Sequence, residues 1–192
     1  MNKITAPFPE KEIKIEALTK QDMNTRITVV YTTTSYLDLE IRNVNVGTSF
    51  TFVKKNFDTR KRKQYTVKLF EDATAMIYGI KHNNKVIAFI ELYKHDDSRR
   101  LYIANLFIAG CERGKHLGTH LIEFAEQKAK ALKCRSLFLD TESCNENAIR
   151  FYQTCGFIIS GFDTSAFSNH DIERKEFSIY FSKEIPNTES DS

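Results

Sequence analysis

The stretch that decides the fold is LYIANLFIAGCERGKHLGT, residues 101–119. Its first part, residues 101–108, is apolar on both sides, which is typical of a central strand. Its second part is a basic turn with two glycines, Gly114 and Gly118, and leads into a helix. A strand followed by such a turn and a helix aims backbone N–H groups and the positive helix end at one point. That point suits a pyrophosphate.

The helix after the turn is predicted from about His116 to Leu132, because apolar residues recur there at helical spacing. These residues are Leu117, Leu121, Ala125 and Ala129, with Ile122 beside them. In the turn itself, the two glycines let the main chain approach an anion closely, and Arg113 and Lys115 add positive charge.

The chain continues with a second buried strand at residues 136–140 and a short helix at residues 146–154. Gly156 follows this helix at a position that favours left-handed backbone. Residues 157–162 and 177–181 then indicate a closing antiparallel pair of strands.

The part before residue 101 is less regular. Residues 74–93 predict a β-hairpin around Asn83-Asn84, since Asn tolerates the positive φ of a tight turn. Residues 26–57 are rich in Thr, Val, Tyr and Phe without a clean period, and we expect strands and loops there. Residues 13–17 alternate as an edge strand does, and Thr19 is expected to cap a helical turn at residues 20–23.

Length and composition favour one α/β domain over residues 1–192, with an arm at 1–12 and a flexible polar tail at 186–192. The chain is 41% hydrophobic, enough for a sizeable core. No apolar window reaches the roughly 20 residues of a membrane span, and the first residues lack the apolar centre of a signal peptide. We therefore expect a cytoplasmic protein without a membrane partner.

Four cysteines are far apart in the sequence, without a Cys-x-x-Cys pair, so we expect reduced thiols and no metal site. The net charge of +3 is too small to argue for a nucleic-acid partner. A local basic run, residues 54–63, has two readings: a footprint for phosphate or anionic lipid, or a solvated face. We favour the solvated face. The run contains Lys54, Lys55, Arg60, Lys61, Arg62 and Lys63.

Two motifs in residues 101–157 resemble the cofactor half of the GNAT superfamily of N-acetyltransferases. In the turn, the family pattern of Gln or Arg, two residues, Gly, one residue, and Gly or Ala corresponds to Arg113, His116, Leu117 and Gly118. His116 departs from the pattern and is tolerable there if its φ is negative. The second motif, Asn-x-x-Ala-x-x-x-Tyr-x-x-x-Gly-Phe, corresponds to Asn145, Ala148, Tyr152, Gly156 and Phe157.

From about Thr74 onward the chain most resembles the streptothricin acetyltransferase subgroup. The added points of resemblance are Asp140-Thr141, Gly161-Phe162-Asp163 and Asn169. The resemblance implies a GNAT-like mixed, mostly antiparallel sheet with helices on both faces. It also implies a splay between the strands at 101–108 and 136–140.

The resemblance further implies that acetyl-CoA is the co-substrate and that its acetyl group passes directly to a primary amine, without a metal. In the resembling enzymes the strand before the turn pairs with the pantetheine arm through its backbone. The positions that correspond to cofactor binding are Leu106, Phe107, Ile108, Arg113, Gly114, Lys115, His116, Leu117, Gly118, Thr119, Asn145 and Tyr152. Asn145 equally suits a helix cap.

Acetyl transfer to an amine needs a base for the amine proton and benefits from an acid for the thiolate. The family motif places Tyr152 as the acid. The streptothricin subgroup carries a Glu-Asp pair in the central strand where this chain has Ala104-Asn105. Glu91 on the neighbouring strand is our first candidate for the base, and Glu142 is the second. Cys144 is expected to be a bystander.

Several acceptors stay open at this point. A streptothricin-like or other small polyamine antibiotic leads, which would make the protein an antibiotic-resistance enzyme, and a protein N-terminus or a lysine side chain follows. Because the acidic pair is missing, a non-catalytic CoA-binding module is an alternative hypothesis. The expected partner is a small-molecule amine, and a homodimer is left open.

Overall fold

The computed structural model describes residues 13–44 and 46–186. The arm predicted at residues 1–12 lies outside the described residues, and so does the predicted tail apart from Pro186. None of the helices in the described ranges is long and apolar enough to cross a membrane.

The main sheet of the described chain has seven strands in the order β1-β4-β5-β6-β7-β9-β8. Every neighbouring pair is antiparallel except β6 and β7, which are parallel. The predicted mixed, mostly antiparallel sheet is therefore confirmed. The strands are β1 (Ile15–Ala17), β4 (Met76–His82), β5 (Lys85–His95), β6 (Arg100–Ile108), β7 (Ser136–Glu142), β8 (Ile158–Asp163) and β9 (Ser178–Glu184).

Most of the predicted elements from residue 74 onward are present. The β4–β5 hairpin turns at Asn83 and Asn84, whose φ angles are 49° and 61°. The predicted helices are α1 (Leu117–Ala131) and α2 (Glu146–Thr154), and Gly156 has a φ of 83° after α2. Two short helices lack a sequence signal that we recognised: η1 (Gly110–Glu112) and α3 (Asp171–Arg174).

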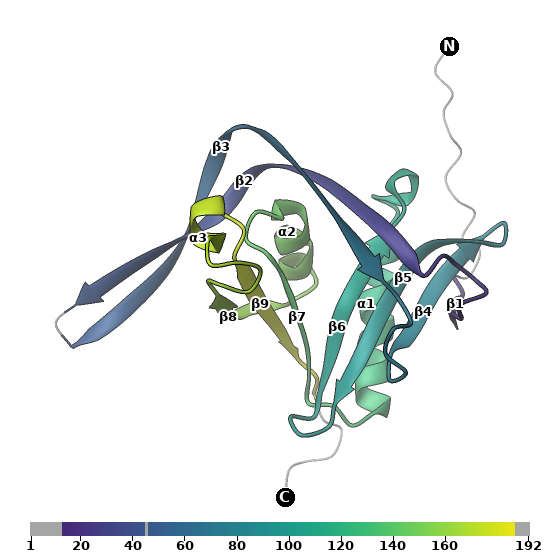
Figure 1. Cartoon of the computed structure of the whole chain (residues 1–192). Helices are drawn as coiled ribbons and strands as arrows, with labels where there is room; N and C mark the ends of the chain where they lie inside the picture. Colours follow the sequence, from purple (N-terminus) through teal and green to yellow (C-terminus); the bar gives the residue numbers. More distant parts are fainter. Residues whose placement is uncertain (1–12, 45, 187–192) are drawn as a thin grey trace, which may run out of the picture.

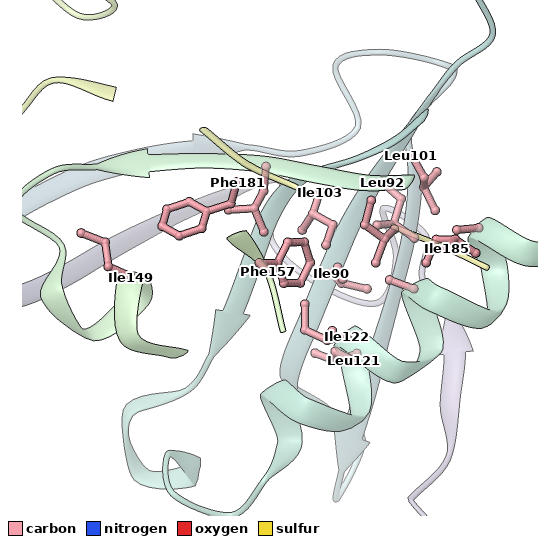
Figure 2. Close-up of a cluster of buried hydrophobic side chains, with 14 of the residues drawn as sticks. Ile90, Leu92, Leu101, Ile103, Leu121, Ile122, Ile149, Phe157, Phe181 and Ile185 are labelled. Atoms are coloured by element: carbon pink, nitrogen blue, oxygen red, sulfur yellow. The ribbon is translucent and has the colours of Figure 1, made fainter. Parts of the chain in front are cut away.

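The predicted sheet flanked by helices is confirmed, and the two long helices, α1 and α2, lie on the same face of it (Figure 2). The parallel connections β6-α1-β7 and β7-α2-β8 advance across the sheet in one direction, and right-handed crossovers then place both helices on one side. The two helices also touch: a Cβ atom on Gly118 of α1 would lie 2.9 Å from Cζ of Phe151 on α2.

A long β-hairpin crosses the sheet (Figure 1). Its base packs on the face opposite the helices, and its outer half contacts α2 and contributes Leu39 to the same cluster as the helices. Its strands, β2 (Arg26–Val44) and β3 (Gly47–Lys68), form a two-stranded sheet of their own and arch over the diverging strands of the main sheet. The strands predicted within residues 26–57 are confirmed, but the loops are not, apart from the turn between β2 and β3. The inward positions of β2 include Thr33 and Ser35, which are buried polar residues and hide the alternation.

Residues 20–22 form the predicted turn, which does not continue into a helix. Thr19 caps it, because the Thr19 hydroxyl accepts a hydrogen bond from the Gln21 backbone N–H at 3.3 Å. The carboxylate of Asp22 accepts from the Thr19 backbone N–H at 2.7 Å and closes the turn from the other side.

Two hydrophobic clusters pack on the two faces of the sheet. On the helix side, Ile90, Leu121 and Phe181 belong to the larger cluster (Figure 2). On the hairpin side, Phe89 packs with Val67 and Leu69 from the base of the hairpin. Each such buried side chain contributes about 1.5–3 kcal/mol to folding. The hairpin is therefore part of the packed fold, at least along its base.

Gly79 of β4 offers a test of this packing. A Cβ atom there would lie 2.5 Å from Leu18 Cδ1 and 2.7 Å from the Ala88 carbonyl oxygen. Gly79→Ala should lower the free energy of unfolding by about 1–3 kcal/mol, as overpacking does. The measurement is urea unfolding. Gly110→Ala is the control, because a Cβ atom there meets nothing within 4 Å. Equal stability of the two variants would contradict the packing of Gly79.

Candidate active site

The sheet opens between β6 and β7 (Figure 1). The two strands pair only at Arg100–Tyr102 with Ser136–Phe138, and then diverge. On its other side β6 remains paired with β5, where a register shift between Glu91 and Leu92 leaves Ala104 as a bulge. In the described sheet, residues 103–108 therefore have no partner strand on the β7 side. The predicted splay is present, and Leu106, Phe107 and Ile108 line it.

The basic turn leads directly from the open strand into α1. Arg113 donates from Nε to the Ile108 carbonyl oxygen at 3.4 Å, and Gly114 has a φ of 79°. Lys115 pairs with Glu112 at 2.8 Å inside the turn. No side chain caps the first turn of α1, so its N–H groups can bind an anionic ligand.

His116 corrects one expectation. Its φ is 59° and its ψ is 8°, which is left-handed backbone, whereas we expected a negative φ. The turn thus keeps the conformation that glycine adopts most easily, and His116 adopts it at a cost of roughly 1 kcal/mol.

The other predicted residues of the turn have structural contacts. Leu117 is buried in the helix-side cluster, so only its backbone is available to a ligand. Gly118 provides room for the Phe151 ring, and this contact sets the approach of α1 to α2. Thr119 is half-buried in the first turn of α1.

Tyr152 lies on α2 with its ring between Phe157 and Phe181, at centroid distances of 5.9 Å and 6.0 Å. Burial raises the pKa of its phenol above the ordinary value, and the charges of Tyr65 and Asp140 raise it further. The phenol therefore keeps its proton at neutral pH. Asn145 caps α2, because its Oδ1 accepts from the Ala148 N–H at 3.3 Å.

Glu91 is a buried carboxylate on β5, only 2% exposed, beside the bulge of β6. It accepts two hydrogen bonds, from Asn105 Nδ2 at 2.5 Å and from the Tyr93 hydroxyl at 3.0 Å. Burial and the bond to Glu91 raise the pKa of Tyr93 to about 12. The carboxylate thus lies next to the position where the streptothricin subgroup has an acidic residue.

Glu142 has a different environment. It accepts a hydrogen bond from the Tyr31 hydroxyl and pairs with Lys63 at 3.3 Å, so it fastens the hairpin to the end of β7. Lys63 also pairs with Glu176. The neighbouring Cys144 is buried, and burial raises the pKa of its thiol to about 11. A thiol that stays protonated agrees with a bystander role.

The basic run at residues 54–63 is partly neutralised. Lys55 pairs with Asp38 at 2.7 Å, Lys54 pairs with Glu146 at 2.5 Å, and Lys63 is held as described. The side chains of residues 60–62 are exposed on β3. This arrangement agrees with the reading as a solvated face.

Three residues at the site were not singled out from the sequence. Tyr93 bonds Glu91, and Tyr102 of β6 bridges the splay by donating to Asp140 Oδ1 of β7 at 2.6 Å. The alternation of Glu91, Tyr93 and His95 along β5 could have revealed Tyr93. Tyr31 carries no comparable signal, because it lies on the hairpin.

Comparison with known proteins agrees with this geometry. Residues 44–157, more than half of the chain, match the sequence profile of the acetyltransferase (GNAT) family. N-alpha-acetyltransferase 30 of Xenopus laevis is 37% identical over 60 residues, which are 31% of this chain. The match spans only 22% of that relative's length.

Solved structures of similar fold cover nearly all of the chain. Nourseothricin acetyltransferase has a TM-score of 0.71 and 20% identity, over 92% of this chain and 100% of that one. A putative streptothricin acetyltransferase from Bacillus anthracis str. Ames, in complex with acetyl coenzyme A, has a TM-score of 0.71 and 22% identity, over 91% and 98%. The ribosomal-protein-S18-alanine N-acetyltransferase of Escherichia coli has a TM-score of 0.53 and 17% identity, over 64% and 76%.

The profile match and the shared fold lead to one assignment. The profile covers the splayed strand β6, the basic turn and both long helices. The chain belongs to the GNAT acetyltransferase family, the N-acetyltransferases that use acetyl-CoA.

Proposed function

We propose that the protein transfers the acetyl group of acetyl-CoA directly to a primary amine while both substrates are bound. The observation that carries this proposal is the open backbone of β6, which ends at a basic turn and an uncapped helix. Free N–H and C=O groups along a strand edge can pair with an extended, amide-rich ligand as with another strand. The pantetheine arm is such a ligand, and its pyrophosphate would then reach α1.

The proposed cofactor contacts follow from this placement. The backbone of Leu106, Phe107 and Ile108 would pair with pantetheine. The N–H groups and cations of the turn would bind the phosphates. The turn residues concerned are Arg113, Gly114, Lys115, His116, Leu117, Gly118 and Thr119. Asn145 holds the start of α2 beside them as its cap.

Tyr152 is the proposed acid. The amine nitrogen attacks the thioester carbonyl carbon, the carbon–sulfur bond breaks, and the departing thiolate takes the phenol proton. Burial raises the pKa of Tyr152, so the phenol holds its proton until the thiolate forms beside it. Tyr152 regains its proton from water.

Glu91 is the proposed final acceptor of the amine proton. An amine with a pKa near 10.4 is neutral in only about one molecule in a few thousand at pH 7, so a proton acceptor is needed. Glu91 is too buried to meet a substrate directly. Its bond to Tyr93 offers a path in which the Tyr93 oxygen receives the amine proton as its hydroxyl proton passes to Glu91.

Two acceptor classes have support. A small amine of the streptothricin type leads, because the two antibiotic acetyltransferases share the fold over more than nine-tenths of both chains. A protein N-terminus is second, supported by the 60-residue match to N-alpha-acetyltransferase 30. The third alternative is a non-catalytic CoA-binding module, which the absence of an acidic pair at Ala104-Asn105 suggested. The Glu91 carboxylate beside Asn105 weakens this alternative.

Removal of the Tyr152 hydroxyl tests the acid. Tyr152→Phe should lower kcat by about 10²-fold or more, as loss of a general acid does, and leave CoA binding nearly unchanged. Thiol release from acetyl-CoA over a panel of amines, including streptothricin and short peptides, measures this. Unchanged turnover would remove Tyr152 from the chemistry. No release with any amine in the wild type, despite CoA binding, would favour the non-catalytic module.

Glu91→Gln tests the base through its pH profile. At pH 7 the variant should lose about 10²–10⁴-fold in kcat/KM, because the amine proton has no acceptor. The deficit should narrow as the pH rises toward the amine pKa, since the free amine then needs no base. The control is Glu123→Gln, an exposed carboxylate on α1. A deficit that stays constant with pH would indicate a structural role for Glu91.

His116→Gly tests the left-handed turn. Glycine adopts this conformation without strain, so the variant should unfold at a higher temperature, with a gain of roughly 1 kcal/mol. It should also bind CoA at least as tightly as the wild type. Calorimetric melting and CoA titration measure both quantities. A less stable variant would mean that the imidazole makes a contact worth more than the strain.

A further inference from the structure

A large open basin lies on the hairpin-side face of the sheet, beside the closed end of the splay. Its volume is about 1050 Å³, and β6, β7, β8 and β9 all contribute to it. Tyr102, Phe138 and Tyr180 line it, at positions that alternate with the buried residues of the helix-side cluster. The basin is thus on the same face as Glu91, Tyr93 and Asn105.

One end of the basin is strongly basic. Arg99, Arg100 and Arg135 gather there, a set that we call the guanidinium cluster. Arg100 lies over the Phe138 ring with its Cζ 4.1 Å from the centroid, and Arg135 donates from Nε to the Ser98 carbonyl oxygen at 3.0 Å. Among the described residues, no carboxylate lies within ion-pair distance of these three guanidinium groups, whereas most lysines of the hairpin are paired.

The other end is acidic and adjoins the splay. Asp140 accepts from Tyr102 at 2.6 Å and from the Ser178 hydroxyl at 3.2 Å. Glu184 lines the basin at its basic end instead, because it pairs with Ser136, whose partner on β6 is Arg100. In the described chain, none of the three guanidinium groups forms an ion pair with it. The basin is therefore dipolar along β6, with Asp140 toward the reacting centre and the guanidinium cluster away from it.

The separation of the two ends follows from the strand. Asn105 and Arg100 are five residues apart on β6, and their partners on β5, Glu91 and His95, are four apart because of the bulge. At roughly 3.3 Å per residue the span is therefore about 13–17 Å, or about 15 Å. A molecule that reaches both ends must span this distance. It would lie over the rings of Tyr102 and Phe138, whose centroids are 4.8 Å apart. The His95 ring is next to both, at 6.0 Å from Tyr102 and 5.1 Å from Phe138.

We propose that the acceptor of this enzyme is a primary amine that carries a carboxylate about 15 Å from its nitrogen. The inference rests on the proposed acetyl transfer, and it favours the second of the two acceptor classes, a peptide N-terminus, over a polyamine of the streptothricin type. The guanidinium cluster binds the carboxylate through charge-assisted hydrogen bonds, and Asp140 attracts the amine end toward the splay. A polycationic acceptor would instead place positive charge against three unpaired guanidinium groups. The basin is thus a specificity site for zwitterionic acceptors.

The test uses three five-residue peptides with a free N-terminus and an amidated C-terminus that differ only at the fifth residue: Glu, Gln or Lys. Their extended length of about 3.3–3.6 Å per residue matches the span. Wild-type kcat/KM should be about tenfold higher for the Glu peptide than for the Gln peptide, and lowest for the Lys peptide. In the double variant Arg100→Gln/Arg135→Gln, the ratio of kcat/KM for the Glu peptide to that for the Gln peptide should fall to near one.

Matched variants separate the cluster from general effects. Arg150→Gln removes an exposed guanidinium on α2, far from the basin, and should keep the preference. Arg135→Gln alone, at an exposed side chain, serves if the double variant does not fold, and should lose part of the preference. Two acidic residues, Glu189 and Asp191, follow soon after Ile185, whose N–H donates to the Arg135 carbonyl at 2.9 Å. All measurements are therefore repeated in Glu189→Gln/Asp191→Asn, which removes two carboxylates that could compete with the peptide. A preference for the Glu peptide that appears only in this variant also supports the cluster.

The outcomes distinguish this inference from the proposed function. Equal kcat/KM for the three peptides, with acetyl transfer intact, would overturn the basin proposal and leave the acetyltransferase activity in place. No transfer to any peptide or amine would contradict the proposed function. In that case, calorimetric binding of the Glu peptide to the CoA-loaded protein decides: about tenfold weaker binding in the double variant but not in Arg150→Gln supports the cluster, and equal binding overturns it.

Discussion

The structure depends on one constraint, which is that β6 can pair fully with only one neighbour. The bulge at Ala104 shifts the register by one residue, but β6 stays paired with β5 on both sides of it, while β7 separates from β6 after three paired positions. The open backbone of β6, which runs into the basic turn, follows from this separation. An acetyl-CoA site in this fold is thus built from missing main-chain hydrogen bonds as much as from side chains.

The hairpin adds a second layer to the fold. Its base packs on the face where Glu91 and Tyr93 lie, and its outer half contributes Leu39 to the cluster of the helices. Its contacts with the end of β7, through Tyr31 and Lys63, hold it over the splay. In the proposed function, cofactor and acceptor would approach from opposite faces of the sheet.

The sequence predicts the second half of the chain well, because its signals are local. Helical spacing in α1, the Asn pair of the β4–β5 turn and the motif around Tyr152 each determine a structure within a few residues. The hairpin is different: its inward positions include Thr33 and Ser35, and its partners are far away in sequence. Glu91 could be named as a candidate because it is a carboxylate on the strand next to β6. Its bonds to Asn105 and Tyr93 could not be predicted, because they depend on a bulge that no local sequence pattern shows.

The length of the hairpin has a consequence for self-association. Both outer edges of the β2–β3 ribbon lack a neighbouring strand along most of their length in the described chain, and Ile41 and Phe50 are about half exposed near its end. Such an edge is a template for pairing with another chain. The exposed cations at residues 60–62 place like charges opposite one another whenever two such ribbons align. Like charges at this edge oppose the pairing of two copies of the ribbon, as charged side chains do on edge strands.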